Sequence, residues 1–103
     1  MKNILVLGGG KVGSAIGYDL SKNYSVTVAD INKTTLERLK SKYNFHTLYS
    51  DFSNINNLKN MIKGYDLIVS AVPGFMGYKT LKTIIEGKKN VVDISFFPEN
   101  ALD

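Results

Sequence analysis

The glycine-rich segment from Gly8 to Gly13 constrains the fold of this chain more than any other feature. It follows an apolar run from Ile4 to Leu7, and after it Val12, Ile16 and Leu20 recur at the spacing of a helix. This order of patterns predicts a strand, a tight turn and a helix in immediate succession.

Within this segment, Gly8, Gly10 and Gly13 fit the pattern G-x-G-x-x-G of dinucleotide-binding turns. The first glycine makes the tight turn, the second lets the backbone approach a pyrophosphate, and the third allows the helix to pack closely against the strand. The helix start then offers backbone N–H groups and partial positive charge to the phosphates. We therefore expect a dinucleotide cofactor here, with Lys11 and Val12 among its contacts.

A second apolar strand, Ser25 to Ala29, ends at Asp30, about 20 residues after Gly10, where the fingerprint requires an acid for the adenosine ribose. Asp30 and its neighbour Ile31 are therefore expected to bind the cofactor. The alternative is that Asp30 serves only locally, ahead of the next helix. Because a carboxylate here would repel the 2′-phosphate of NADP, the sequence favours NAD, although Lys33 leaves NADP possible.

Apolar strands alternate with amphipathic helices along the rest of the chain. Strands are expected at Phe45 to Tyr49, Asp66 to Val72 and Asn90 to Ile94, with helices after Asn32, after Ser53 or Asn54, and between Gly74 and Gly87. This alternation predicts a Rossmann-type α/β three-layer sandwich, with a five-stranded parallel sheet of order 3-2-1-4-5 and helices on both faces.

Further candidate contacts follow the third and fourth strands, because ligands of such sheets bind outside the carboxyl ends of the strands. Asp51 could accept from the adenine amino group while the ring of Phe52 lies beside the base, or Asp51 could cap the next turn. Ala71, Val72 and Pro73 end the fourth strand beside the first, where small residues leave room for the nicotinamide ribose.

Composition and charge limit the partners and the location that can be expected for this chain. The 103 residues suffice for one domain, and the 13 basic residues that outnumber 9 acidic ones are spread along the predicted helices. Without a basic stripe interleaved with aromatic residues, we expect no nucleic-acid partner. No apolar run approaches the roughly 20 residues of a spanning helix, and no signal peptide precedes the first strand. We therefore expect no membrane association and a cytoplasmic location.

No catalytic residue or metal site is expected from these residues. The chain has no cysteine, which excludes thiolate catalysis and cysteine-bound metal. The one histidine, His46, opens a predicted edge strand without further metal-ligating residues nearby, so a structural or exposed role is expected. In hydride transfer the cofactor carries most of the difficult chemistry, and the proton donor is not evident here.

Several segments together resemble a known family. They are LVLGGGKVGSAIGYDL, VTVADIN and DLIVSAVPGFMGYKTLKTIIEGKKNVVDISFFPENALD, of which Ala71 to Gly74 and Val92 to Glu99 are the most particular. The chain resembles the N-terminal NAD(P)-binding part of saccharopine dehydrogenase-like proteins, in particular lysine and saccharopine dehydrogenases. The resemblance implies an NAD(P)-dependent oxidoreductase that makes or breaks the C–N bond of an amino acid by hydride transfer through an imine. It also implies cofactor contacts at Gly8, Gly10, Gly13, Asp30, Asp51 and Ala71 to Pro73.

Residues 1–103 would then form the NAD(P)-binding domain of a larger protein, because in that family the substrate domain follows this point. We expect the isolated domain to be inactive. The alternative is a non-catalytic NAD-sensing domain of the potassium-uptake type, which would not carry the PGFMG and DISFFPEN segments. Phe96, Phe97 and Leu102, together with an open fifth strand, predict a homodimer.

Overall fold

The strand that precedes the glycine turn, β1 (Asn3–Leu7), lies at the centre of the sheet. In the computed structural model, which describes residues 2–51, 54–71, 87 and 90–93, the side chains from Ile4 to Leu7 are at most 2% exposed. Burial on both faces explains why this strand is a continuous apolar run, since a central strand of a parallel sheet has no solvent-facing side.

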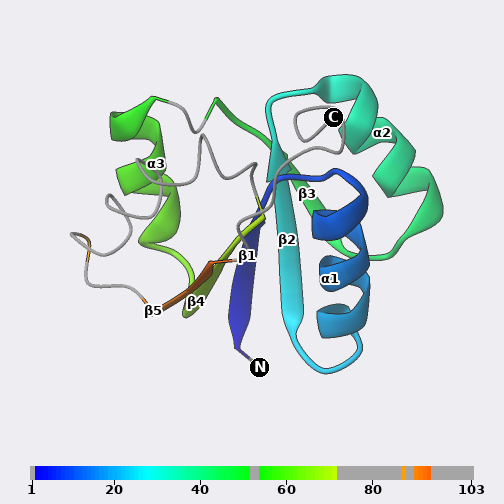
Figure 1. The fold of residues 1–103 in the computed structure, drawn as a ribbon, viewed down its shortest axis with the longest axis horizontal. Coiled ribbons are helices and arrows are strands. Elements are labelled where there is room, and N and C mark those ends of the chain that lie inside the picture. Colours follow the sequence, from blue (N-terminus) through cyan, green and yellow to red (C-terminus); the bar gives the residue numbers. More distant parts are fainter. Residues whose placement is uncertain (1, 52–53, 72–86, 88–89, 94–103) are drawn as a thin grey trace, which may run out of the picture.

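Four further strands extend the sheet on both sides of β1, and every pairing is parallel. They are β2 (Ser25–Asp30), β3 (His46–Tyr49), β4 (Leu67–Ser70) and β5 (Asn90–Asp93). Their order across the sheet is β3-β2-β1-β4-β5. The predicted five-stranded parallel sheet and its order are therefore confirmed, and the carboxyl ends of the strands lie along one edge (Figure 1).

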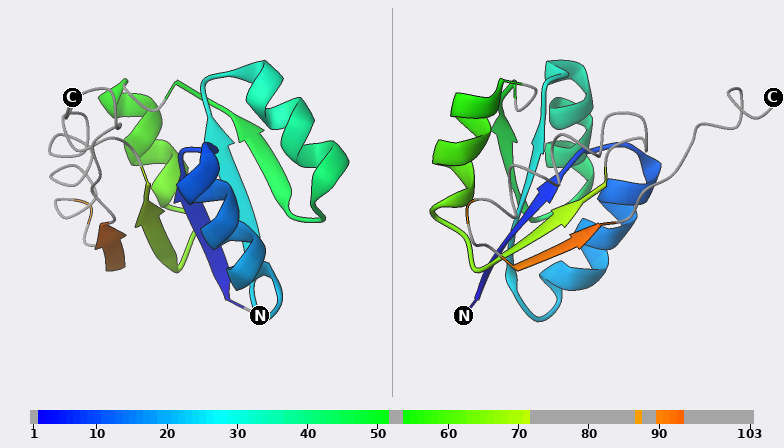
Figure 2. Two further views of the ribbon diagram at one scale, coloured as in Figure 1. Left: turned by 45° about the vertical axis from the view of Figure 1, so that its right-hand side comes forward. Right: turned by 60° about the vertical axis from the view of Figure 1, so that its left-hand side comes forward.

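Helices cover both faces of this sheet. Among the described residues they are α1 (Lys11–Ser21), α2 (Lys33–Lys42) and α3 (Ile55–Ile62). α1 and α2 lie on one face and α3 lies on the other, as the views in Figures 1 and 2 agree. This arrangement confirms the predicted three-layer sandwich. The helix expected between Gly74 and Gly87 falls almost wholly outside the described residues.

Alternate side chains of the strands supply two hydrophobic clusters, one under each helical layer. The cluster under α1 and α2 contains Ile4, Val6, Val26, Val28, Leu39, Phe45, Val69 and Ala71. The cluster under α3 contains Leu5, Leu7, Ala29, Leu58, Ile62 and Ile68. Each fully buried Leu, Ile or Val side chain contributes about 1.5–3 kcal/mol to folding, so these two clusters hold the strand ends in place.

Asparagine side chains cap the second and third helices. Asn32 Oδ1 accepts from the backbone N–H of Thr35 at 3.2 Å, at the start of α2. At the start of α3, Asn54 Oδ1 accepts from the N–H groups of Asn56 and Asn57 at 3.0 and 3.2 Å. Asn54, rather than Ser53, is therefore the N-cap of α3.

Strand boundaries differ from the sequence prediction in β3 and β4. β4 ends at Ser70, so Ala71 follows the strand and is not its last part as predicted. β4 begins at Leu67 because Asp66 instead bonds to the first residue of β1: its N–H donates to the Asn3 carbonyl and its carboxylate accepts from the Asn3 N–H, both at 2.8 Å. β3 begins one residue after Phe45, which lies buried with its ring 5.1 Å from that of Tyr43. Phe45 thus serves tertiary packing, whereas exposed Asp66 joins the start of β4 to the start of β1.

Among the described residues, no helix has the length and apolar character needed to cross a bilayer. The hydrophobic residues expected to mediate dimer formation, Phe96, Phe97 and Leu102, lie outside the described residues.

Candidate dinucleotide-binding site

The turn after β1 requires glycine at its first position. Gly8 has a φ of 103°, a conformation that residues with a side chain rarely adopt. Its N–H donates to the Ala29 carbonyl at 2.8 Å, which joins the turn to the end of β2. The turn therefore lies at the carboxyl edge, between the ends of β1 and β2.

The third glycine of the motif is required by close packing. A Cβ atom built on Gly13 would lie 1.8 Å from the Gly8 carbonyl oxygen and 2.9 Å from its carbon. The same Cβ would be 3.5 Å from Ala71 Cβ, just after β4. Only a glycine at position 13 lets α1 approach the turn this closely.

The second glycine faces open space. A Cβ on Gly10 would meet no atom of the described residues within 4 Å, so this part of the fold does not require glycine here. Gly10 is the N-cap of α1 but has no side chain to bond the first amides of the helix, and the first turn carries no acid. Exposed amide donors beside open space are what a pyrophosphate needs, and this geometry fits the cofactor that the motif predicts.

Asp30 joins the turn to the loop after β2. Its Oδ2 accepts from the Gly9 N–H at 2.7 Å, and its Oδ1 accepts from the Asn32 N–H at 2.8 Å. The structure thus contains the local role that was the alternative interpretation of Asp30. Each carboxylate oxygen retains acceptor capacity, so a ribose hydroxyl could still bond to it.

Gly9 is a site residue that the sequence analysis missed. A Cβ at this position would lie 3.0 Å from Leu39 Cδ1, 3.2 Å from Asp30 Oδ2 and 3.3 Å from Thr35 Cγ2. α2 and the Asp30 carboxylate therefore pack directly on the turn. The sequence did carry a signal for Gly9. Gly8, Gly9 and Gly10 are adjacent, and the motif G-x-G-x-x-G leaves the residue between Gly8 and Gly10 free to be any type, so a glycine there needs another explanation.

Beyond Asp30, two exposed apolar side chains border the edge. Ile31 is 52% exposed and Tyr49, paired with Asp30 across β2 and β3, is 54% exposed. Lys33 Nζ lies 4.8 Å from the centre of the Tyr49 ring, a cation–π contact that draws Lys33 toward β3.

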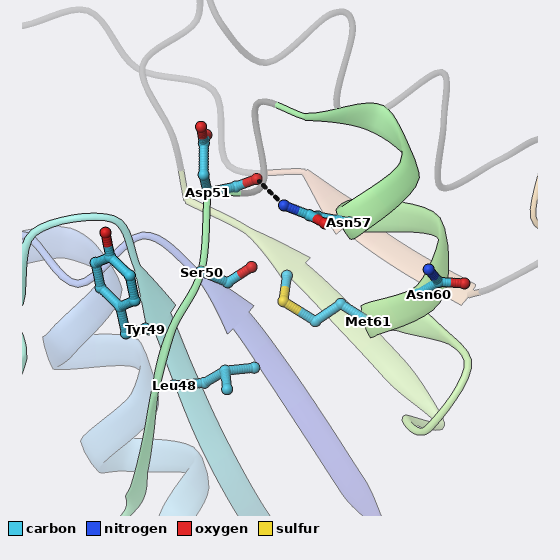
Figure 3. A pocket seen from close by; sticks show the side chains of 7 residues that line it. All are labelled: Leu48, Tyr49, Ser50, Asp51, Asn57, Asn60 and Met61. Carbon is cyan, nitrogen blue, oxygen red and sulfur yellow. Dashed lines mark hydrogen bonds between the residues drawn. The ribbon is translucent and has the colours of Figure 1, made fainter.

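A shallow cavity of about 540 Å³ lies between β3 and α3. Figure 3 shows Ser50 and Met61 extending into the space between these elements, while the carboxylate of Asp51 points away from it. The Asp51 carbonyl accepts from Asn54 N–H and from Asn57 Nδ2 at 3.2 and 3.3 Å, so its backbone helps to shape the turn before α3. Phe52, the predicted neighbour of the adenine base, lies outside the described residues.

The structure thus brings part of the predicted set together. Gly8, Gly13, Asp30 and Ala71 meet at the carboxyl edge, where Ala71 is 5% exposed and its N–H donates to the Leu7 carbonyl at 2.9 Å. Lys11 and Val12 begin α1 at the same edge. Val72 and Pro73 lie outside the described residues.

One buried hydroxyl at this edge was also missed. Ser70, the last residue of β4, is fully buried, and its Oγ has no hydrogen-bond partner in the described part of the chain. The sequence did not indicate a role for Ser70, because it lies in an almost continuously apolar strand.

His46 is exposed, and the described residues include no cluster of three potential metal ligands.

A parallel sheet with a glycine turn, an uncapped helix start and an acid at the end of β2 defines a dinucleotide-binding domain of the Rossmann type. The model of the family described as "Saccharopine dehydrogenase NADP binding domain" matches residues 4–102, and the chain belongs to this family. The match supports a nicotinamide dinucleotide as cofactor and favours NADP over the NAD that Asp30 predicts.

Solved structures share the fold. The apo saccharopine dehydrogenase (L-Glu forming) of Saccharomyces cerevisiae superposes with a TM-score of 0.81 at 24% identity, over 96% of this chain and 23% of that protein. A short-chain dehydrogenase/reductase from Veillonella parvula in complex with NADP has a TM-score of 0.64 at 13% identity, over 89% of this chain and 46% of that one.

A curated relative, the glutamyl-tRNA reductase of Thermoplasma acidophilum, is 30% identical over 88 residues, which are 85% of this chain and 20% of that protein. The chain therefore spans about a fifth of the length of this relative and of the yeast enzyme.

Proposed function

We propose that this chain binds NADP as the cofactor domain of an oxidoreductase that acts on the C–N bond of an amino acid. The observation that carries the proposal is the family match over residues 4–102, joined to a glycine turn whose second position faces open space. When bound, the cofactor would supply hydride transfer, while the turn and the α1 amides would hold its pyrophosphate and Asp30 its adenosine ribose.

The amino-acid substrate is the finer part of the proposal. The support is that the yeast protein of the same fold is a saccharopine dehydrogenase and that the family carries its name. We also propose that residues 1–103 act as the cofactor domain of a larger enzyme, in the cytoplasm, and that copies associate as homodimers. The competing function is a non-catalytic sensor that binds the cofactor without turning it over.

Calorimetric titration with NADP, NAD and ADP-ribose tests the cofactor site, with Gly10→Ser as the diagnostic variant. A serine N-cap would accept from the first-turn amides of α1 and stabilise the fold by a few tenths of a kcal/mol relative to glycine. It would also occupy the space and the donors meant for the pyrophosphate, and losing one charge-assisted hydrogen bond weakens binding by about tenfold or more. A higher melting temperature together with weaker binding is therefore expected.

Gly64→Ser is the matched control, because a Cβ there also meets no atom within 4 Å in the described part of the chain. Gly64 lies after α3, beside the opposite ends of the strands. It should leave binding unchanged. If Gly10→Ser bound all three ligands as tightly as the parent chain, the pyrophosphate would lie elsewhere.

The reaction itself is tested on the native protein, isolated from its own cells with an antibody against this chain. Reduction of NADP on addition of an amino acid or an N-substituted amino acid such as saccharopine, followed by nicotinamide absorbance, supports the oxidoreductase. Tight binding without reduction by any of these substrates supports the sensor.

A further inference from the structure

A basic groove lies between α1 and α2, beside the glycine turn. Its volume is about 300 Å³. It is lined by Gly10, Lys11 and Ser14 from one side and by Arg38, Leu39, Lys42 and Tyr43 from the other. None of these described lining residues is acidic, so three cationic side chains border one small space.

The groove adjoins the atoms that would hold the adenosine ribose. Leu39 lines the groove and its Cδ1 lies 3.0 Å from a Cβ built on Gly9, whose N–H donates to Asp30 Oδ2 at 2.7 Å. A ribose that bonds to Asp30 while its diphosphate reaches the start of α1 must therefore pass over Gly9 and Gly10. Of these two residues Gly10 lines the groove, and Gly9 connects it to the Asp30 carboxylate.

We propose that this groove holds the 2′-phosphate of NADP, with Lys11 and Arg38 as the specificity-determining residues. The inference rests on the proposed cofactor function and deepens it. The guanidinium of Arg38 offers paired donors that match a phosphate, and Lys11 adds a second positive charge from the opposite wall. Within the described part of the chain, neither side chain forms an ion pair with an acid.

This assignment also reconciles Asp30 with a phosphorylated cofactor. Both carboxylate oxygens already accept backbone hydrogen bonds, at 2.7 and 2.8 Å, and the N–H dipoles partly offset the negative charge. The remaining repulsion is countered by the cations on the groove walls. Asp30 therefore does not require NAD, contrary to the preference inferred from its position in the sequence.

Lys33 was the candidate for the 2′-phosphate in the sequence, and the structure gives it a different setting. Its Nζ lies 4.8 Å from the Tyr49 ring centre, on the β3 side of the edge, whereas Lys11 and Arg38 lie on the α1 side. If Lys33 binds the 2′-phosphate, Lys33→Ala should lose the NADP preference. If the groove binds it, the preference should be lost on substitution of Lys11 and Arg38.

The test is calorimetric titration of the 103-residue chain and its variants with NADP, NAD and ADP-ribose. The double variant Lys11→Ala/Arg38→Ala should lose at least about tenfold in NADP affinity, because each removed cation takes a charge-assisted hydrogen bond with it. Its affinities for NAD and ADP-ribose should stay within about threefold of the parent values, a difference below about 0.7 kcal/mol. Lys40→Ala removes a charge from the same helix outside this groove and should leave the NADP preference intact.

The outcomes separate the two proposals. A parent chain that binds none of the three ligands overturns the cofactor function and the groove with it. A parent chain that binds NAD and NADP equally, or a double variant that keeps its NADP preference, overturns the groove alone. A loss of preference in Lys33→Ala, with none in the double variant, would assign the 2′-phosphate to Lys33 instead.

Discussion

Gly13→Ala should destabilise the domain strongly, because the added methyl group would collide with backbone. The Cβ would lie 1.8 Å from the Gly8 carbonyl oxygen, about 1.2 Å less than the 3.0 Å below which real Cβ atoms are essentially never found. Gly8 cannot rotate freely to relieve the contact, because its φ of 103° and its 2.8 Å hydrogen bond to Ala29 hold the turn in place. α1 would have to move away from β1, and a close-packed core does not allow such a shift without losing contacts.

The expected loss follows from this geometry. Overpacking that side-chain shifts can relieve costs about 1–3 kcal/mol, and here both obstructing atoms belong to the backbone, so about 3 kcal/mol or more is expected. For a domain of this size, 1 kcal/mol corresponds to roughly 4–8 °C in melting temperature. The melting temperature should therefore fall by at least about 12 °C. It can be measured by far-ultraviolet circular dichroism.

Gly17→Ala is the matched control on the same helix. Its Cβ would meet Val28 Cγ2 at 3.0 Å and Phe45 Cε2 at 3.4 Å, and both are side-chain atoms that can adjust. Alanine also exceeds glycine in helix propensity by about 1 kcal/mol, which offsets the crowding. A Gly13→Ala variant that melts within about 4 °C of Gly17→Ala would refute the packing argument.

Two further predictions concern Asp30 and the sheet edge. Asp30→Ala should lower the free energy of unfolding, measured in urea, by about 1–3 kcal/mol, because the Gly9 and Asn32 amides lose a charged acceptor. The same variant should bind NADP more weakly. Unchanged stability would mean that these two hydrogen bonds contribute nothing to folding. The proposed homodimer should be visible by light scattering as a mass that rises with concentration and should weaken in Val92→Lys, since Val92 is 46% exposed on the edge strand β5. A monomer over a wide concentration range would contradict it.

Local patterns were sufficient for most of the fold. The apolar run before Gly8 and the helical spacing after Gly13 predict strand, turn and helix, because these periods reflect which side of each element is buried. The strand order followed from the alternation of strands and helices, since parallel crossovers are right-handed. Asn32 and Asn54 marked helix starts through the bonding capacity of their side chains.

Site residues were predicted less completely, because their roles depend on contacts between segments far apart in the chain. The glycine pattern identified positions 8, 10 and 13, and its expected packing role for Gly13 and open approach at Gly10 agree with the space around each glycine. The pattern gave Gly9 no role, although its amide donates to the carboxylate of Asp30 at the end of the next strand.

The sequence by itself determined the Rossmann-type sheet, the glycine turn and the acid at the end of β2, because each depends on patterns of residues close together in the chain. The tertiary structure alone decided that Lys11 from α1 and Arg38 from α2 share one groove, and that Asp30 is already bonded to the turn. The physical reason is that the distance between α1 and α2 depends on how both helices pack on the same face of the sheet. The residue pattern within either helix does not specify that distance.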